Sequence, residues 1–391
     1  MNKKTAEHVV IVGGAILGSF CAWSLRDQGF SGQITVVEKD SSYRYCSTAL
    51  SAACIRLQFA TPLNIQMSLY GVEFLRDVKS RLGQDAEIDY VEDGYLILGS
   101  EKSIEQRRAL IELQRAQGAD IVELNPAEIA NRYPMLDLDG VGIGAYGQSG
   151  EGWFDAYSLM TSARKAARAS DVTYIEAEVN SFDTTSEGVT GVVLADGRTL
   201  DCDWCILAAG AWSGGLIHNI GIELPVVPRK RTVFSFKSPV EGIGMPMIVD
   251  TSGFWLRPEG HEFIGGIYPD PTEDFDAHDD FEPHHHLLES EFWPALATRV
   301  PAMEEMRLLS SWAGHYEINT LDHNAVIGPH SDLKNLIFAT GFSGHGVMHA
   351  PAAGRGVAEW ITTGQYQSLD LSPLGWDRIA NNRPLVESVV I

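Results

Sequence analysis

A glycine-rich turn and a carboxylate twenty residues beyond it have the types and spacing needed to hold a dinucleotide. The turn consists of Gly13, Gly14, Ala15, Ile16, Leu17 and Gly18, and the carboxylate belongs to Glu38. Glycine lets the backbone turn tightly, the next helix N-terminus offers free N–H groups to a pyrophosphate, and the carboxylate accepts hydrogen bonds from ribose hydroxyls. Ala15 replaces the usual middle glycine, so we expect the phosphate to approach slightly less closely.

The residues around this turn predict a β-α-β unit that positions it. Residues 9–12 are a continuous β-branched run, residues 20–25 have apolar side chains at helical spacing, and residues 34–37 form a second apolar run that ends at Glu38. The alternative interpretation is a plain β-α-β unit whose glycines serve only packing.

Two further strand-to-glycine turns lie far along the chain. Residues 204–210 read as a strand that ends in small residues, and residues 336–341 read as another that leads into a glycine-rich loop and a helix. A nicotinamide enzyme would need only the first of the three turns. The pattern therefore favours a longer dinucleotide such as FAD, bound along its full length.

Composition limits the classes of partner. The chain has 391 residues, which suits two packed domains, and a formal net charge of -23, which disfavours nucleic acid and anionic membrane surfaces. No apolar run is long enough to span a bilayer. Five cysteines, an odd number, suit a reducing cytoplasmic compartment better than a disulfide framework. We expect no metal site, because the histidines of residues 278–286 read as a solvated face.

The expected fold is an α/β protein in which two domains are interleaved. A Rossmann-type FAD-binding domain takes residues 1–85, 150–225 and 325–391. An α+β substrate-binding domain with an antiparallel sheet takes residues 86–149 and 226–324. The second assignment rests on successive strand-like runs between residues 225 and 268.

Together, the three turns and the small-residue loop that ends at Arg56 resemble the D-amino-acid oxidase superfamily of flavoproteins. The similarity is greatest to its sarcosine oxidase, glycine oxidase and dimethylglycine dehydrogenase group. It implies FAD. Some relatives attach the flavin through a cysteine where this chain has Gly314, and others through a histidine near Ala49 or Leu50. We therefore expect a noncovalent FAD.

The resemblance also implies which residues contact the cofactor. The helix that begins in the loop 341–346 would point its N-terminus at the flavin pyrimidine edge, where negative charge develops on reduction. Residues expected at the cofactor are Gly13, Gly14, Ala15, Ile16, Leu17, Gly18, Glu38, Lys39, Ser47, Thr48, Ala49, Ser51, Val179, Ala209, Gly210, Trp212, Gly341, Gly344, His345, Gly346, Val347 and Met348.

An anchor for a substrate carboxylate is expected among the arginines. Sarcosine oxidases use a lysine where this chain has Met348, so another cation must replace it. Arg257, on the same face of its strand as Trp255, and Arg56 are the two candidates, because a guanidinium binds a carboxylate through two hydrogen bonds. Either arginine could instead be structural. The other residues expected at the substrate are Tyr268, His315 and Tyr316.

The predicted reaction is hydride transfer from the carbon beside a secondary amine of an N-substituted amino acid. A D-amino acid or a 2-hydroxy acid is an alternative substrate, and the latter would need His315 or His345 as a base. Oxygen-activating relatives have a lysine where this chain has Ile264, so a dehydrogenase that passes electrons to a protein or a quinone is favoured over an oxidase. A second hypothesis is a flavin-bearing assembly protein without turnover.

Overall fold

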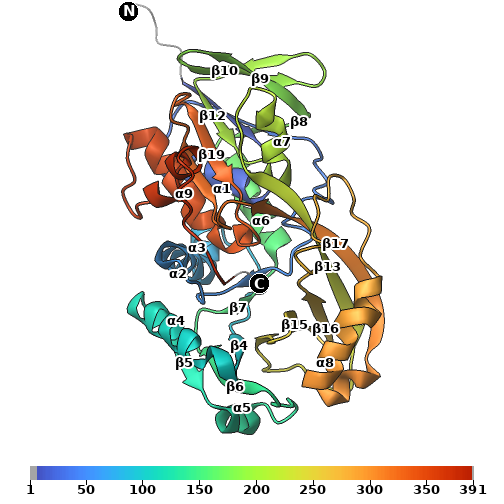
Figure 1. Ribbon diagram of the computed structural model, residues 1–391. Helices are drawn as coiled ribbons and strands as arrows, with labels where there is room; N and C mark the ends of the chain where they lie inside the picture. The colour runs from blue at the N-terminus through green and yellow to red at the C-terminus, as the bar shows by residue number, and fades with distance from the viewer. Residues whose placement is uncertain (1–6, 390–391) are drawn as a thin grey trace, which may run out of the picture.

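The computed structural model describes residues 7–389 and places most strands in two large sheets, seen in the upper and lower halves of Figure 1. The first sheet has six strands in the order β18-β19-β12-β1-β2-β8, and all its pairs are parallel except β18 with β19. Its strands are β1 (His8–Val12), β2 (Gln33–Glu38), β8 (Thr173–Glu176), β12 (Trp204–Leu207), β18 (Val326–Pro329) and β19 (Leu336–Thr340).

Side chains alternate along β1, so its two faces belong to different cores. Val9 and Ile11 pack with helices on one face, whereas Val10 and Val12 pack with a three-stranded sheet and two short helices on the other. The first face is covered by α1 (Ile16–Asp27), α2 (Pro62–Arg76), α3 (Val78–Leu82), α6 (Ala156–Ala169) and α9 (Gly346–Thr363). The second is covered by β9 (Val179–Thr185), β10 (Gly188–Leu194), β11 (Thr199–Asp201), α7 (Ser213–His218) and α10 (Trp376–Ala380).

The second sheet has eight strands in the order β17-β13-β16-β15-β14-β4-β6-β5. Its pairs are antiparallel except β14 with β4. Its strands are β4 (Tyr95–Ser100), β5 (Ile121–Leu124), β6 (Val141–Gly147), β13 (Val226–Lys237), β14 (Met247–Val249), β15 (Phe254–Glu259), β16 (Glu262–Ile267) and β17 (Arg307–Asn319). Its helices are α4 (Ile104–Ala116), α5 (Pro126–Arg132) and α8 (Trp293–Arg299), and a short pair, β3 (Cys54–Ile55) with β7 (Gly152–Trp153), crosses towards the first sheet.

This architecture confirms the predicted fold class, a parallel Rossmann-type sheet combined with a mostly antiparallel one. The six-stranded sheet takes strands from three separated parts of the chain, and the eight-stranded sheet takes them from the two parts between. The boundaries assigned to the two domains stay a prediction. None of the helices found between residues 7 and 389 has the length and apolar composition that a bilayer crossing requires.

Two glycines allow the β1-turn-α1 segment to pack closely. Gly13 has a φ of +95°, and a Cβ there would lie 2.3 Å from the carbonyl oxygen of Ala208. A Cβ on Gly18 would lie 1.9 Å from the carbonyl oxygen of Gly13. Any larger residue at these positions would force α1 away from the ends of β1 and β12. The glycines of the first turn therefore serve packing as well as the cavity that it borders.

We expect Gly354→Ala to destabilise the protein by about 1–3 kcal/mol. A Cβ at Gly354 in α9 would lie 2.7 Å from the backbone carbon of Phe20 in α1, so the two helices would have to separate. Urea unfolding measures the change. Gly215→Ala in α7 is the control, because a Cβ there meets no atom within 4 Å and alanine favours helix. Equal stability of Gly354→Ala and the native chain would contradict this packing.

Candidate functional site

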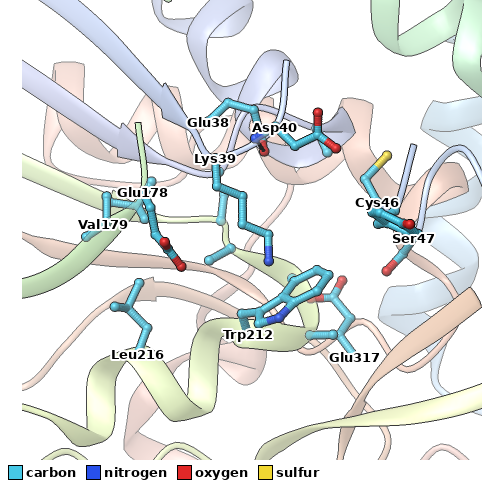
Figure 2. Close-up of a pocket in the computed structure, with 18 of the residues that line it drawn as sticks. Glu38, Lys39, Asp40, Cys46, Ser47, Glu178, Val179, Trp212, Leu216 and Glu317 are labelled. Atoms are coloured by element: carbon cyan, nitrogen blue, oxygen red, sulfur yellow. Dashed lines mark hydrogen bonds between the residues drawn. The ribbon is translucent and has the colours of Figure 1, made fainter. Parts of the chain in front are cut away.

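The largest cavity described here, with a volume of about 910 Å³, opens at the carboxyl ends of the parallel strands. It is bordered by the turns after β1, β2 and β12. Ligands of open α/β sheets bind at this edge, and the volume is at the upper end of the range of roughly 300–1,000 Å³ typical of ligand pockets. Figure 2 shows this cavity, with Glu38 and Lys39 on one side and Trp212 and Glu317 opposite.

The first turn of α1 is free to bind an anion. Ala15 is the N-cap and has no side chain that could cap the helix, so the first N–H groups of α1 lack the usual partner. Gly13, Ala15, Ile16 and Leu17 line the cavity here. A phosphate at this position would accept hydrogen bonds from these groups and would be stabilised by the helix dipole.

Glu38 lies at the end of β2 and borders the same cavity. Its carboxylate accepts hydrogen bonds from the N–H groups of Gly14, at 2.8 Å, and Asp40, at 3.0 Å. Burial raises its pKa, and these hydrogen bonds oppose the rise. A carboxylate has about four acceptor positions, so capacity remains for two ribose hydroxyls.

A lysine and a tryptophan form the wall beyond Glu38. The Lys39 ammonium lies 3.5 Å from the centre of the Trp212 ring, which is a cation–π contact. Figure 2 shows the lysine pointing towards this ring. Val179, Ala209 and Gly210 line the cavity beside them. The three segments that bring these residues together come from distant parts of the chain.

A second, smaller cavity of about 100 Å³ continues the first towards the eight-stranded sheet. Both are bordered by Ile16, Leu17, Ser47, Thr48 and Glu317, so one extended ligand could occupy both. The smaller cavity lies between the loop 51–54, the start of α9 and side chains of the eight-stranded sheet. Its members among the expected cofactor residues are Ile16, Leu17, Ser47, Thr48, Ser51, Gly344, His345, Gly346, Val347 and Met348.

Four residues expected at the cofactor do not line these cavities. Gly14 donates its N–H to Glu38, and Gly18 lies against the backbone of Gly13. Gly341 has a φ of +74° and packs against Val226, and its N–H donates to Glu317. Ala49 follows Thr48 but does not border the cavity. The spacing located the turns, but it did not resolve which residues of a turn face outward.

Arg56 and His345 meet in the smaller cavity. The Arg56 Nη2 atom lies 3.1 Å from His345 Nε2, and because arginine can only donate, Nε2 accepts and the imidazole is neutral. Burial lowers the pKa of His345 well below its usual value, and the positive charge of Arg56 lowers it further. Arg56 also donates to the carbonyl oxygens of Gln58 and Val389. His345 therefore orients Arg56.

The other arginine candidate, Arg257, is paired outside the cavities. Arg257 borders none of the cavities described here, and its Nη1 atom lies 2.5 Å from the Glu259 carboxylate. It also donates to the carbonyl oxygens of Ala52 and Pro258. The two residues are neighbours on one face of β15, which is why they pair. The geometry favours Arg56 as the carboxylate anchor.

The remaining substrate candidates lie together at the edge of the smaller cavity. Trp255, His315 and Tyr316 border it, and a narrow extension of about 30 Å³ adds Tyr268. The His315 ring stacks on Phe281 at 4.0 Å, its Nε2 donates to the Asp280 carbonyl oxygen, and its buried Nδ1 has no partner among the described residues. Nε2 therefore carries a proton, and burial lowers the pKa of His315, which favours the neutral ring with Nδ1 as an acceptor.

Glu317 is a site residue that the sequence analysis missed. It borders both cavities, and its carboxylate accepts hydrogen bonds from the Gly341 N–H and the Thr340 hydroxyl, both at 2.9 Å. Burial raises its pKa to about 7. The signal in the sequence was an acidic residue directly after Tyr316 in a strand-like run. Tyr95 and Met247, which complete the wall, gave no such signal.

The residues present fit an extended FAD. The large cavity offers a carboxylate for a ribose and free N–H groups for a pyrophosphate, and the smaller cavity offers a flat space lined by small side chains beside the N-terminus of α9. The N-cap of α9, His345, has no side-chain capping bond, so the first N–H groups of α9 remain available to a carbonyl oxygen.

Sequence comparison identifies the class of protein that this fold and site define. A family model described as FAD dependent oxidoreductase, abbreviated DAO, matches residues 8–360. The chain belongs to this family. The resemblance to the D-amino-acid oxidase superfamily is confirmed, and membership implies FAD as the cofactor of an oxidoreductase.

Several individual proteins are similar to this chain over nearly its whole length. The FAD-dependent oxidoreductase domain-containing protein 1 of Xenopus laevis is 36% identical, covering 98% of this chain and 84% of that protein. Human mitochondrial sarcosine dehydrogenase is 24% identical, covering 92% of this chain and 40% of that protein. The crystal structure of L-proline dehydrogenase from P. horikoshii matches with a TM-score of 0.84 and 26% identity, covering 96% of this chain and 98% of that one.

We expect Glu317→Gln to remove a pH dependence of stability. The pKa of Glu317 is about 7 in the folded protein, against an ordinary 4.5, so the folded state binds more protons between these values. The contribution of Glu317 to the free energy of unfolding therefore falls as pH rises through that window. Glutamine imitates the neutral acid. As pH rises, the free energy of unfolding of the variant should therefore increase relative to that of the native chain, by up to about 3 kcal/mol.

Urea unfolding at a series of pH values measures this difference. Glu105→Gln, a substitution at an exposed side chain on α4, is the control and should give a difference that does not change with pH. A constant difference for Glu317→Gln as well would contradict the raised pKa of Glu317.

Proposed function

We propose that the protein is an FAD-dependent dehydrogenase that oxidises the C–N bond of an N-substituted amino acid. The product would be an imine, which water hydrolyses. The observation that supports this best is the small cavity beside the start of α9, which has one buried guanidinium at its edge. Two relatives are named for sarcosine and L-proline, both secondary amino acids.

The protein would orient the substrate and exclude water from it. When bound, FAD supplies a two-electron acceptor that takes a hydride from the substrate carbon. Trp255, Tyr316 and Met247 exclude water on the side of the eight-stranded sheet. No charged base is needed if the amine binds unprotonated, because its own lone pair assists departure of the hydride. The His315 ring borders the same cavity and, when neutral, has an acceptor at Nδ1.

Arg56 would hold the substrate carboxylate. His345 and Val389 occupy both Nη2 protons and Gln58 occupies one Nη1 proton, so Nε–H and one Nη1–H remain. A carboxylate would obtain a parallel pair of donors by displacing the Val389 carbonyl oxygen from Nη2. One face of the guanidinium lies 3.9 Å from the Phe59 ring, which restricts its orientation. The charge is therefore fixed in place before the substrate arrives.

A 2-hydroxy acid substrate is less favoured. It would need a base within reach of the hydroxyl, and the Nε2 lone pair of His345 already accepts a hydrogen bond from Arg56. His315 retains a free Nδ1 but has a pKa lowered chiefly by burial, so it would hold an abstracted proton weakly. Secondary amines avoid this requirement.

The electron acceptor is proposed to be a protein or a quinone instead of oxygen. Ile264 in β16, where oxygen-activating relatives have a lysine, is buried and apolar. A positive charge beside the flavin would stabilise superoxide, so its absence at this position favours another acceptor.

The first experiment is an anaerobic titration of the purified yellow protein with N-methyl, N-carboxyalkyl and D-amino acids. We expect the absorbance near ~450 nm, which is that of the cofactor, to bleach with at least one secondary amino acid and to recover slowly in air. Fast recovery in air would contradict the dehydrogenase assignment. Bleaching by none of the amines would favour the flavin-bearing assembly protein. Acid precipitation should release the flavin, because we propose a noncovalent cofactor.

A second experiment compares the two arginine candidates. We expect Arg56→Lys to raise KM for the amino acid at least about tenfold, because lysine cannot bind a carboxylate through two parallel hydrogen bonds. Arg257→Lys should change KM far less, since Arg257 is paired with Glu259 outside the cavities. Steady-state kinetics with a dye acceptor measures both. A large rise in KM for Arg257→Lys alone would reverse the assignment.

A further inference from the structure

A cavity of about 400 Å³ lies beyond the smaller cavity, between the eight-stranded sheet and α4. Its walls include Ile97 and Val249 from the sheet, Arg107 from α4, and Val389 from the segment that follows α10. None of the roles described so far uses it. Its size would admit a substituent of several atoms.

This cavity continues the same sheet face that the smaller cavity uses. Side chains alternate along β4 and β14, so Tyr95 and Ile97 share a face, as do Met247 and Val249. Tyr95 and Met247 border the smaller cavity, whereas Ile97 and Val249, one pleat further along, border the 400 Å³ cavity. A ligand lying on this face would pass directly from one cavity to the other.

Val389 lies at the boundary between the two cavities. It packs against the apolar cluster that contains Tyr95, Ile97 and Val249, and its carbonyl oxygen accepts a hydrogen bond from Arg56 Nη2 at 2.6 Å. Besides accepting this hydrogen bond, Val389 donates its N–H to the Glu387 carboxylate at 2.9 Å, and its side chain is partly buried. A carboxylate at Arg56 would compete with this carbonyl group and would join the two cavities if the segment moved.

The positive charge of Arg107 is not paired with a carboxylate in the part of the chain that the structure describes. Among residues 7–389 it takes part in no ion pair, and its buried Nε atom has no hydrogen-bond partner. Burial lowers its pKa, and the positive charge of Arg56 lowers it further, so the two guanidinium groups are near enough to repel. A buried or half-buried charge is costly unless it is paired, and a ligand anion between the two arginines would remove that cost.

The carboxylate that borders the cavity does not neutralise Arg107. Asp250 accepts a hydrogen bond from Arg299 Nε at 2.5 Å and another from the Ser252 N–H at 2.9 Å, so its charge is already balanced. Arg108, the next residue on α4, points the other way and pairs with Glu105 and Glu123 on the surface. The local charge of the cavity is therefore positive in a chain whose net charge is -23.

We propose that the 400 Å³ cavity is a subsite for a second anionic group, so that the substrate is an amino acid whose N-substituent ends in a carboxylate. This inference rests on the proposed function, because it assumes that the first carboxylate binds Arg56 beside the flavin. The amine then lies at the smaller cavity, the substituent follows the sheet face past Val389, and the second carboxylate pairs with Arg107.

The test uses the purified protein with its cofactor and ligands matched in length. The acidic ligands are N-(carboxymethyl)glycine and its carboxyethyl and carboxypropyl homologues, and the neutral ones are N-ethyl-, N-propyl- and N-butylglycine. Anaerobic calorimetry measures binding, and flavin absorbance measures reduction in the same samples. We expect the best acidic ligand to bind at least about tenfold more tightly than its neutral match.

Variants of two neighbouring arginines test whether Arg107 causes the preference for the acidic ligand. Arg107→Gln should abolish the preference for the acidic ligand and leave the neutral ligand within about twofold, Arg107→Lys should restore part of it, and Arg108→Gln should change neither. The proposal is overturned if the native protein shows no preference, or if Arg107→Gln weakens both ligand types equally.

The two proposals fail in different ways. Tight binding of an acidic ligand that Arg107→Gln removes, with no flavin bleaching by any amine, would support the subsite and contradict amine oxidation. Bleaching by acidic and neutral ligands with equal affinities would support amine oxidation and overturn the subsite.

Discussion

The site depends on how the segment between the two sheets satisfies its buried backbone groups. The N–H groups of residues 57–58 donate to the buried carboxylate of Glu151, and those of residues 60–61 donate to the buried carboxylate of Glu387. An unpaired buried N–H costs about 1–3 kcal/mol, so these two carboxylates fix the path of the segment. Burial raises the pKa of Glu151 to about 7, which is the electrostatic cost of this arrangement. Arg56 takes its position from the same segment.

The parallel sheet brings distant turns to one edge. β1, β12 and β19 are neighbours in the sheet although they are separated by most of the chain, and their carboxyl ends deliver Gly13, Gly210 and the loop before α9 to the same region. Because the eight-stranded sheet closes over this edge, a charge placed there is removed from water. One guanidinium in such a place makes the local electrostatic potential positive, although the net charge of the whole molecule is -23.

The sequence predicted the β1-α1-β2 unit and the family, and most of the residues that it placed at the cofactor, Glu38 among them, border the cavities. These features arise from short-range rules, in which apolar periodicity selects strand or helix and glycine selects the turn. It could not separate Arg56 from Arg257, because both are arginines near small or aromatic residues in the chain. The difference is a pairing of Arg257 with Glu259 and a contact of Arg56 with His345, 289 residues away.

The sequence by itself determined that the chain builds a dinucleotide site on a Rossmann-type sheet, because the signals for that site are contiguous. Only the tertiary structure decided which charges face the interior. Glu317 and Arg107 are ordinary charged residues in the sequence, and they become unusual because sheets and helices from other parts of the chain bury them. Burial is a property of packing between distant segments, and no local pattern specifies it.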